Sequence, residues 1–375
     1  MSRLMILQIL TSLSPGGAER LVLDMMPRFN PDAFDVRLAI LLDDQRALDV
    51  YGHQGRAVDV FDMRGMGAPA SLLALRHYVR QSAPDVIHAH MFHPLVAAAI
   101  ATVGMRRPPA LCFTSHCNEL AFPPLRSAIV RALRGCRAAD IVFVEGQHPS
   151  LNADNVVVIP NGVDVPPTEP VRTPWQPDGP VQLVSIGRLA DQKDPLGLIR
   201  IMATIDNPHV KLDFYGEGPL EAEMRDLIAQ LNLGGRVRLK GLSRDVRAVM
   251  SRADIMVMPS KFEGMPMAML EAGSEAMPVI ATPVGANARI LGTDRGTITE
   301  AATFGSALVR MIADPAAALA AGQRLRRYVE DHHSITATTR MHETVYRQIA
   351  HTKAPCIHTK NGVLIGREAD RGIGQ

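Results

Sequence analysis

Residues 181–205 read VQLVSIGRLADQKDPLGLIRIMATI and contain the pattern that decides the fold. A short apolar run, 181–187, is followed by a polar loop and then by an apolar helical pattern that begins at Pro195. A mainly apolar strand that leads into a helix is typical of a parallel sheet buried on both faces. This stretch therefore predicts one strand–loop–helix unit of an α/β domain.

The same alternation covers most of the chain, with one interruption. Strand and helix patterns alternate from residue 4 to 160, restart at 181, and give way to helical patterns from about 302 to 350. We therefore expect an α/β protein with two doubly wound, parallel-sheet, Rossmann-like domains that face a central cleft. The expected strands are 4–10, 36–42, 85–90, 110–116, 140–145, 155–160, 181–187, 210–216, 237–241, 254–260 and 278–282.

The domain boundaries follow from a change of composition. Residues 166–180, PPTEPVRTPWQPDGP, are rich in proline and predict a linker between a first domain at 1–165 and a second at 181–335. We expect residues 336–350 to form a helix that packs back on the first domain, and 351–375 to form a loose tail.

The overall composition excludes several classes of protein. The chain has 375 residues, a net charge of +2 and only 4% aromatic residues, which disfavours a nucleic-acid-binding protein. It lacks the run of about 18 apolar residues that a membrane helix needs. The four cysteines form no C-x-x-C pair, so free thiols in a reducing, cytoplasmic setting are expected.

Ligands of doubly wound sheets bind at the carboxyl ends of the strands, so the residues that follow each strand are the candidate site. After the first strand, SPGGAER places Gly16 and Gly17 at a helix start, where backbone amides can bind an anion. This is not a G-x-G-x-x-G dinucleotide motif, and a tight turn explains it equally well.

Histidines follow two other strands of the first domain. His88, His90 and His93 could ligate a metal, but they have no cysteine or carboxylate partner nearby, so side chains that line a cleft or are satisfied structurally are favoured. His116 ends the next strand in TSH and could donate a hydrogen bond or act as a base. A polar strand terminus remains the alternative.

Charged residues follow two strands of the second domain. Arg188 and Lys193 share one loop and suit a diphosphate, although a solvated basic loop is the alternative. In KFEGMPMAMLEA, residues 261–272, Glu263 lies in a loop, Pro266 suits the first helical position and Glu271 lies in the helix. Two such carboxylates can bind sugar and ribose hydroxyls, or they can be a capping acid and a salt-bridged acid.

These motifs, in this order, resemble the retaining glycosyltransferases of family 4, which have the two-domain GT-B fold. The motifs are SPGGAER, TSH, VIPNGVD, SIGRLADQKDP, FYGEGPL and SKFEGMPMAMLEA, and the resemblance covers nearly all of residues 4–350. It implies sugar transfer from a nucleotide sugar to a glycan or lipid-linked acceptor, with no cofactor and no metal required. In bacteria, relatives of this type build surface polysaccharides or lipopolysaccharide.

The resemblance also implies roles for the candidate residues. Arg188 and Lys193 would bind the donor diphosphate, Glu271 the ribose, and Glu263 the donor sugar. His116 would contact the sugar or the acceptor side. The remaining residues would contribute backbone to the donor site: Gly16, Gly17, Gly264, Met265, Pro266 and Met267.

The sequence departs from the family pattern in two regions. Residues 145–155 are short where the family has a helix. Gly285-Ala-Asn-Ala-Arg289 lacks the acid that the family carries after this strand. A nucleotide-sugar epimerase of the same fold, or a non-catalytic GT-B-like subunit, are therefore alternative functions.

A basic segment suggests where the acceptor could come from. Residues 125–137, LRSAIVRALRGCR, carry Arg126, Arg131, Arg134 and Arg137 beside an apolar stripe. Such a helix can bind an anionic membrane surface, which would make the protein peripheral on the inner face of the cytoplasmic membrane. An ordinary surface helix packed on the sheet explains the pattern equally well.

Overall fold

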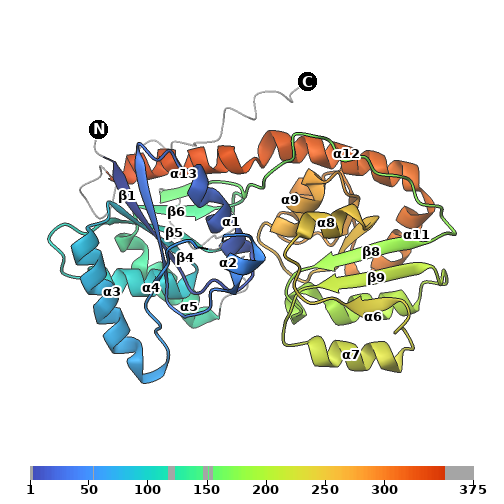
Figure 1. Cartoon of the computed structure of the whole chain (residues 1–375), viewed down its shortest axis with the longest axis horizontal. Coiled ribbons are helices and arrows are strands. Elements are labelled where there is room, and N and C mark those ends of the chain that lie inside the picture. Colours follow the sequence, from blue (N-terminus) through green and yellow to red (C-terminus); the bar gives the residue numbers. More distant parts are fainter. Residues whose placement is uncertain (1–2, 54, 117–122, 147–150, 152–154, 351–375) are drawn as a thin grey trace. The chain divides into compact units, whose positions relative to one another are not determined.

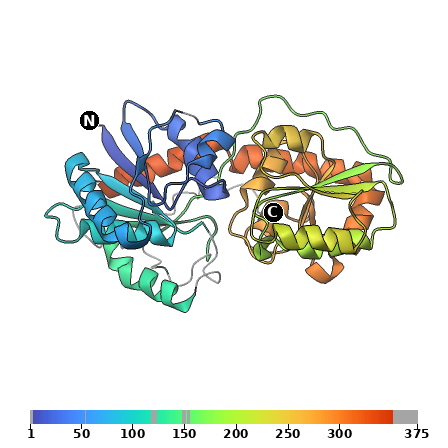
Figure 2. The same cartoon turned by 60° about the horizontal axis from the view of Figure 1, so that its bottom comes forward.

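The computed structural model describes residues 3–53, 55–116, 123–146, 151 and 155–350. The chain divides into two compact units, unit 1 with residues 1–161 and 335–375, and unit 2 with residues 162–334. Each unit is a parallel sheet flanked by helices (Figures 1 and 2), which confirms the predicted α/β class. The predicted tail, 351–375, and most of the short segment 145–155 lie outside the described residues.

Unit 1 contains a seven-stranded sheet in the order β3-β2-β1-β4-β5-β6-β7, and its described strand pairs are parallel. The chain winds outward from β1 in one direction and then from β4 in the other, so the strand order reverses between β1 and β4. The strands are β1 (Leu4–Leu10), β2 (Phe34–Ile40), β3 (Asp59–Val60), β4 (Val86–His90), β5 (Ala110–Thr114), β6 (Ala139–Val142) and β7 (Val156–Val158).

One face of this sheet is apolar and the other carries polar side chains. Leu7, Ile9, Ile87 and Ala89 pack against helices α3 and α4 in the core. The alternate residues point to the opposite face, because side chains alternate along a strand. The helices of unit 1 are α1 (Gly17–Met25), α2 (Arg46–Val50), α3 (Ala68–Ser82), α4 (Phe92–Thr102), α5 (Pro124–Ala132) and α13 (Ile335–Ala350).

Helix α13 returns to unit 1 after the chain has formed unit 2, and it contacts α1, β1 and β4. Its buried stripe includes Thr338, His342 and Tyr346, which all have exposed fractions of 3% or less. The backbone N–H of Asn30 donates to Glu343 Oε1 at 2.8 Å. The helix therefore covers the polar face of the sheet.

Unit 2 contains a six-stranded parallel sheet in the order β10-β9-β8-β11-β12-β13. Here the strand order reverses between β8 and β11. The strands are β8 (Val181–Ile186), β9 (Val210–Tyr215), β10 (Val237–Leu239), β11 (Ile255–Met258), β12 (Val279–Ala281) and β13 (Thr297–Ile298).

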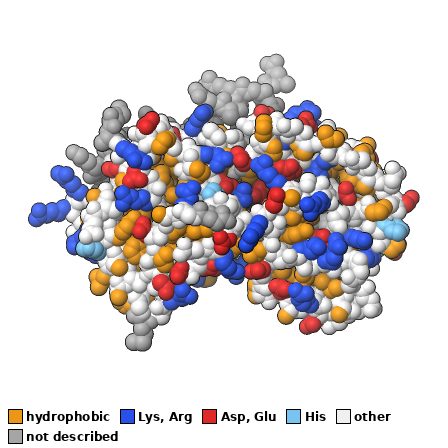
Figure 3. All heavy atoms as spheres, in the orientation of Figure 1, with side chains coloured by type: hydrophobic (Ala, Val, Ile, Leu, Met, Phe, Trp, Pro, Cys, Tyr) orange, Lys and Arg blue, Asp and Glu red, His pale blue; other side chains and the backbone are white. Residues whose placement is uncertain are grey.

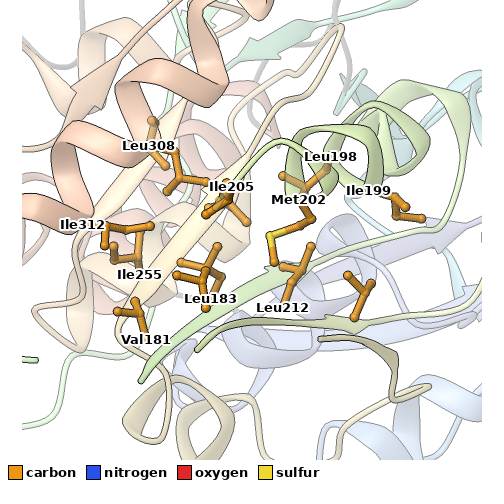
Figure 4. Packing of buried hydrophobic residues seen from close by; sticks show 14 of the residues in the cluster. Val181, Leu183, Leu198, Ile199, Met202, Ile205, Leu212, Ile255, Leu308 and Ile312 are labelled. Carbon is orange, nitrogen blue, oxygen red and sulfur yellow. The ribbon is translucent and has the colours of Figure 1, made fainter. Parts of the chain in front are cut away.

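The core of unit 2 lies between this sheet and helices α6 and α11 (Figure 4). Leu183 and Leu212 from the sheet meet Leu198 and Met202 from α6, and Leu308 comes from α11. Each such side chain contributes about 1.5–3 kcal/mol when it is fully buried. The helices are α6 (Pro195–Ala203), α7 (Glu221–Gln230), α8 (Val246–Ser251), α9 (Met267–Ser274), α10 (Asn287–Leu291), α11 (Phe304–Ala313) and α12 (Pro315–His332).

The predicted linker at residues 166–180 is instead part of unit 2. Arg172 donates hydrogen bonds to the backbone carbonyls of Met250, Ala253 and Glu275. Trp175 is 6% exposed and its Nε1–H donates to the carbonyl of Ile312 at 2.9 Å. The proline-rich composition correctly indicated a segment without helix or strand. It carries no information about the contacts that this segment makes with the rest of unit 2.

The surface shows no large area of one charge in the view of Figure 3, where cationic and anionic side chains are interspersed. Among the described helices, no single one combines the length and the hydropathy of a membrane span, although the bent pair Ala301–Ala313 and Pro315–His332 passes on length and composition.

The predicted basic helix at residues 125–137 is shorter than expected. Helix α5 ends at Ala132, and a 3-10 turn, Leu133–Cys136, follows it. Arg137 does not belong to the exposed basic face, because it is only 1% exposed and forms two hydrogen bonds with Asp140, of 2.5 and 3.0 Å. Its third hydrogen bond goes to the carbonyl of Val130 at 2.6 Å.

Replacement of Asp140 by alanine is expected to destabilise unit 1 by about 3–5 kcal/mol, because it leaves the Arg137 guanidinium buried without its counter-ion. The double variant R137M/D140A is expected to recover part of this loss. Urea unfolding should be followed by circular dichroism, which reports both units, and by fluorescence of Trp175, the only tryptophan, which reports unit 2. An unchanged circular dichroism transition in D140A would contradict this prediction.

Candidate functional site

The loops that follow β8 and β11 are neighbours at the reversal point of the unit 2 sheet. Lys193, at the end of the 3-10 turn Asp191–Lys193, donates to Glu263 Oε1 at 2.5 Å. The Glu263 carboxylate is 5% exposed and the Lys193 side chain 21%. The structure thus brings together two of the residues that the sequence predicted as site residues.

Backbone contacts connect the same two loops. The N–H of Lys261 donates to the carbonyl of Gln192 at 2.8 Å, and the Gln192 amide donates to the carbonyl of Phe262 at 3.0 Å. Lys261 also pairs with Asp191, at 2.5 Å. The Lys193–Glu263 pair therefore lies within a loop pair that is bonded at several points.

Two buried side chains support Glu263, and the sequence had not singled them out. Ser260 is 2% exposed and donates to Glu263 Oε1 at 2.7 Å. Thr282, at the end of β12, donates to the carbonyl of Ser260 at 2.5 Å. Both hydrogen bonds to the carboxylate thus converge on Oε1. Ser260 could have been suspected from its place at the end of the strand run MVMPS.

Two glycines fix how closely the loops approach. Gly285 has φ of 56°, and a Cβ there would lie 2.5 Å from the carbonyl oxygens of Glu263 and Gly264. Gly216 has φ of 141°, and a Cβ there would clash with the carbonyl of Gly187. These backbones can meet only because neither position carries a side chain.

The other predicted donor-binding residues of unit 2 lie on these loops or on α9. Arg188 is exposed, and among the described residues its guanidinium has no hydrogen-bond or ion-pair partner. Glu271 lies in the second turn of α9 and is half-buried. Pro266 is the N-cap residue rather than the first helical residue, and the Met265 and Met267 side chains are buried. Any donor contact from residues 264–267 would therefore come from the backbone.

In unit 1, the predicted site residues follow β1 and β5. His116 has a left-handed backbone, with φ of 56°, and its Nε2 lies 2.8 Å from Nδ1 of His90. Burial, together with His342, lowers the pKa of His116 to about 3, so the ring is neutral at physiological pH. A ring with so low a pKa is also a weak base. The roles of His116 and of the cleft remain predictions.

His88 and His90 are satisfied structurally, as the sequence favoured. Both are 1% exposed or less, and burial lowers both pKa values well below the usual range. His88 contacts Tyr346 and Thr114, and His90 contacts Gln8. Among the described residues, no group of three or more histidine, cysteine or acidic side chains is placed to bind a metal ion.

Gly16 and Gly17 begin helix α1, with Gly16 as the N-cap residue. The Glu19 carboxylate folds back over Gly16, so that a Cβ at Gly16 would lie 2.5 Å from Glu19 Oε2. Burial raises the pKa of Glu19 to about 7, and the nearby charge of Asp44 raises it further. A hydrogen bond from the backbone of Glu19 itself acts in the opposite direction and lowers the pKa. Phosphate binding by these glycines stays a prediction.

Comparison with known proteins supports the family. A profile described as "Glycosyltransferase Family 4" matches residues 15–166, and one described as "Glycosyl transferases group 1" matches 171–324. The two matches together cover most of the chain, which belongs to the family 4 type of GT-B glycosyltransferases. It is 23% identical to the putative glycosyltransferase EpsF of Bacillus subtilis over 301 residues, which are 73% of this chain and 78% of EpsF.

A second relative and a solved structure extend the comparison. The chain is 29% identical to the UDP-Gal:alpha-D-GlcNAc-diphosphoundecaprenol alpha-1,3-galactosyltransferase of Escherichia coli, over 35% of this chain and 38% of that protein. The structure of HepE from Anabaena in complex with UDP-glucose superposes with a TM-score of 0.79 at 19% identity, covering 92% of this chain and 100% of HepE. The predicted GT-B architecture is confirmed.

The pH dependence of stability should report the environment of Glu19. A carboxyl group whose pKa rises on folding stabilises the fold while it is protonated, so this contribution is complete below about pH 4.5 and is lost as the pH rises through about 7. Above pH 8, Glu19→Gln should be about 1–3 kcal/mol more stable than the natural protein. Urea unfolding across this range tests it, with the exposed Glu223→Gln as the control. Parallel profiles for all three proteins would contradict the prediction.

Proposed function

We propose that this glycosyltransferase moves a hexose from a nucleoside diphosphate sugar to a glycan or lipid-linked acceptor, with retention of configuration and without a metal ion. The observation that carries the proposal is the Lys193–Glu263 pair beside Arg188 at the reversal point of the unit 2 sheet. This is where ligands of doubly wound sheets bind.

The charges at this point suit a diphosphate leaving group. Glycosyl transfer moves negative charge onto the departing diphosphate while positive charge develops on the sugar. Arg188 is exposed and can approach the phosphates, and Lys193 can bind them while it remains paired with Glu263. Two fixed cations can thus stabilise the leaving group, which is the basis for proposing a reaction that needs no metal.

The Glu263 carboxylate can serve the sugar at the same time. Ser260 and Lys193 both donate to Oε1, so Oε2 is left to accept a hydrogen bond from a sugar hydroxyl. Glu271, in the second turn of α9, would accept hydrogen bonds from the ribose hydroxyls. Retention would follow if the acceptor attacks on the face that the diphosphate leaves, with the diphosphate accepting its proton.

The relatives favour a role in the synthesis of surface polysaccharide or lipopolysaccharide. One similar protein is named for transfer to a diphosphoundecaprenol-linked sugar, and others are named for colanic acid and lipopolysaccharide core synthesis. We extend this role, and a cytoplasmic site of action, to the present chain. A lipid-linked acceptor would also account for the basic side chains of α5 and of the 3-10 turn that follows it.

Replacement of Arg188 by alanine should weaken binding of the donor nucleotide about ten- to hundredfold, because a charge-assisted hydrogen bond to phosphate is lost. Calorimetric titration with UDP, GDP, ADP and their hexoses measures this. Arg200→Ala removes another exposed arginine, from α6 of the same unit, and should leave affinity unchanged. Equal affinities in R188A and R200A would contradict the proposed donor site. Binding that survives without sugar transfer would favour the epimerase or the non-catalytic subunit.

Helix α5 and the 3-10 turn that follows it should bind anionic membranes through Arg126, Arg131 and Arg134, beside the 73% exposed Leu125. Flotation with phosphatidylglycerol vesicles should show binding that added salt weakens and that reversal of all three charges to glutamate abolishes. Reversal of Arg200, Arg252 and Arg310, three exposed arginines of unit 2, changes the net charge equally and should leave flotation intact. Equal losses in both triple variants would point to net charge alone.

A further inference from the structure

A pocket with a volume of about 230 Å³ lies between helix α8 and strands β8, β9 and β10 of unit 2, the elements that Figure 1 shows. The apolar core lies on the other face of these strands, where Leu183 and Leu212 pack against α6. Side chains alternate along a strand, so the pocket is lined by the residues between those of the core. All of its lining residues belong to unit 2.

The lining of this pocket carries an excess of positive charge. Arg238, Lys240 and Arg252 are cationic, and Asp213 is the one carboxylate among the lining residues. The pocket therefore has a net charge of +2. The three cationic residues are exposed, whereas Asp213 is only 6% exposed. The cations are thus at the rim, where a charged ligand can reach them from solvent.

Asp213 and Arg238 form a bidentate pair across two neighbouring strands. The two residues lie opposite each other in the register of β9 and β10. The guanidinium donates from Nε to Oδ1 at 2.7 Å and from Nη2 to Oδ2 at 2.9 Å. This pairing neutralises the buried carboxylate and fixes the guanidinium in one orientation. Among the described residues, Nη1 of Arg238 has no partner and remains available as a donor.

Three more donors of the pocket have no partner within the described part of the chain. They are the Lys240 ammonium, the Arg252 guanidinium and the Tyr215 hydroxyl. Burial and the charge of Asp213 raise the pKa of Tyr215, and the charges of Arg238 and Arg252 act in the opposite direction. The phenol therefore keeps its proton at physiological pH and lies within electrostatic reach of both arginines.

The floor of the pocket is apolar. It is formed by Val184 and Ala253, which are 1% and 4% exposed, and by the half-buried Val249. An apolar floor suits the carbon skeleton of a ligand whose charged group lies at the rim. Pockets for drug-sized ligands measure about 300–1,000 Å³, so this smaller pocket suits a compact anion rather than a nucleotide or an acyl chain.

We propose that this pocket is a second anion site of the protein, which binds a small, soluble phosphate monoester such as a sugar phosphate. A phosphate monoester has a charge of about −2 at neutral pH and three acceptor oxygens. Its charge matches that of the pocket, and its oxygens can accept hydrogen bonds from Lys240, Arg252 and Tyr215. The pocket consists of side chains within the strands, whereas Arg188 and Lys193 lie on the loop after β8, so the inference does not rest on the proposed function.

Calorimetric titration of the full chain tests the chemical class of the ligand. Glucose 6-phosphate should bind at least about tenfold more tightly than glucose 6-sulfate, which has the same shape but only one negative charge, and added salt should weaken its binding. Glucose should not bind this pocket. Equal affinities for the phosphate and the sulfate would overturn the proposal. Tighter binding of dihexanoyl phosphatidic acid than of glucose 6-phosphate would overturn the assignment to a soluble ligand.

The double variant Lys240→Ala/Arg252→Ala tests the residues of the pocket. It should bind glucose 6-phosphate at least about tenfold more weakly, because two charge-assisted hydrogen bonds are lost. Lys211→Ala/Arg310→Ala is the matched control, because it removes one exposed lysine and one exposed arginine of unit 2 that do not line the pocket. Equal affinities in the two double variants would overturn the proposal.

Tyr215 reports whether the ligand occupies this pocket. The chain has five tyrosines, so spectra of protein labelled with ¹³C at tyrosine are simple, and Tyr215→Phe assigns the signal of that residue. Glucose 6-phosphate should shift the Tyr215 signal along a curve with the Kd that calorimetry gives. An unshifted signal at saturation would place the ligand elsewhere and overturn the proposal.

Variants of the two sites separate this proposal from the proposed function. Arg188→Ala should leave the affinity for glucose 6-phosphate unchanged, and Lys240→Ala/Arg252→Ala should leave the affinity for UDP unchanged. Loss of UDP binding in the double variant would make the pocket part of the donor site and overturn its assignment as a second site. If Arg188→Ala binds nucleotides normally, the proposed donor site fails, and the measurements on Tyr215 still decide whether the pocket binds a phosphate monoester.

Discussion

The ion pair between Lys193 and Glu263 is the interaction on which the arrangement of the unit 2 loops depends. A glutamate that is 5% exposed would be costly without its partner, and the lysine carries the only positive charge bonded to it among the described residues. The pair joins the loop after β8 to the loop after β11, and the strand order reverses between these two strands. It therefore connects the two halves of the sheet at their carboxyl ends. Ser260 donates a hydrogen bond to the Glu263 carboxylate, and Gly285 lets the loop after β12 approach the backbone of Glu263.

Most of the fold could be predicted from the sequence because both sheets are buried on both faces. Strands such as Leu4–Leu10 and Ile255–Met258 are apolar runs, broken only by Gln8 in the first, and both propensity and pattern favour them. The short elements β3, β13, α2 and α10 have between two and five residues, too few for a periodic signal. Residues 166–180 were misassigned as a linker because composition reports the lack of regular structure, and the contacts of Arg172 and Trp175 are made with residues far along the chain.

The candidate site was predictable only where its chemistry is local. The positions of Arg188, Lys193 and Glu263 follow from counting residues after each strand, and the structure joins two of them. Gln8 gave a weak signal, as the single polar residue within LMILQIL, but its partner Tyr346 is 338 residues away. Arg137 was counted with an exposed basic face, although the acid that buries it, Asp140, is only three residues further on.

Polar side chains are stabilised in different ways in the two units. Unit 2 places charged side chains on loops, where Arg188 stays exposed to solvent and Lys193 keeps Glu263 as its counter-ion. In unit 1, burial lowers the pKa of His88, His90 and His116, so these side chains are neutral and are stabilised by hydrogen bonds instead of ion pairs. Exposed or partly exposed charged groups stay ionised because water or a counter-ion stabilises them, whereas the buried face of unit 1 can hold its polar groups only as neutral, hydrogen-bonded side chains.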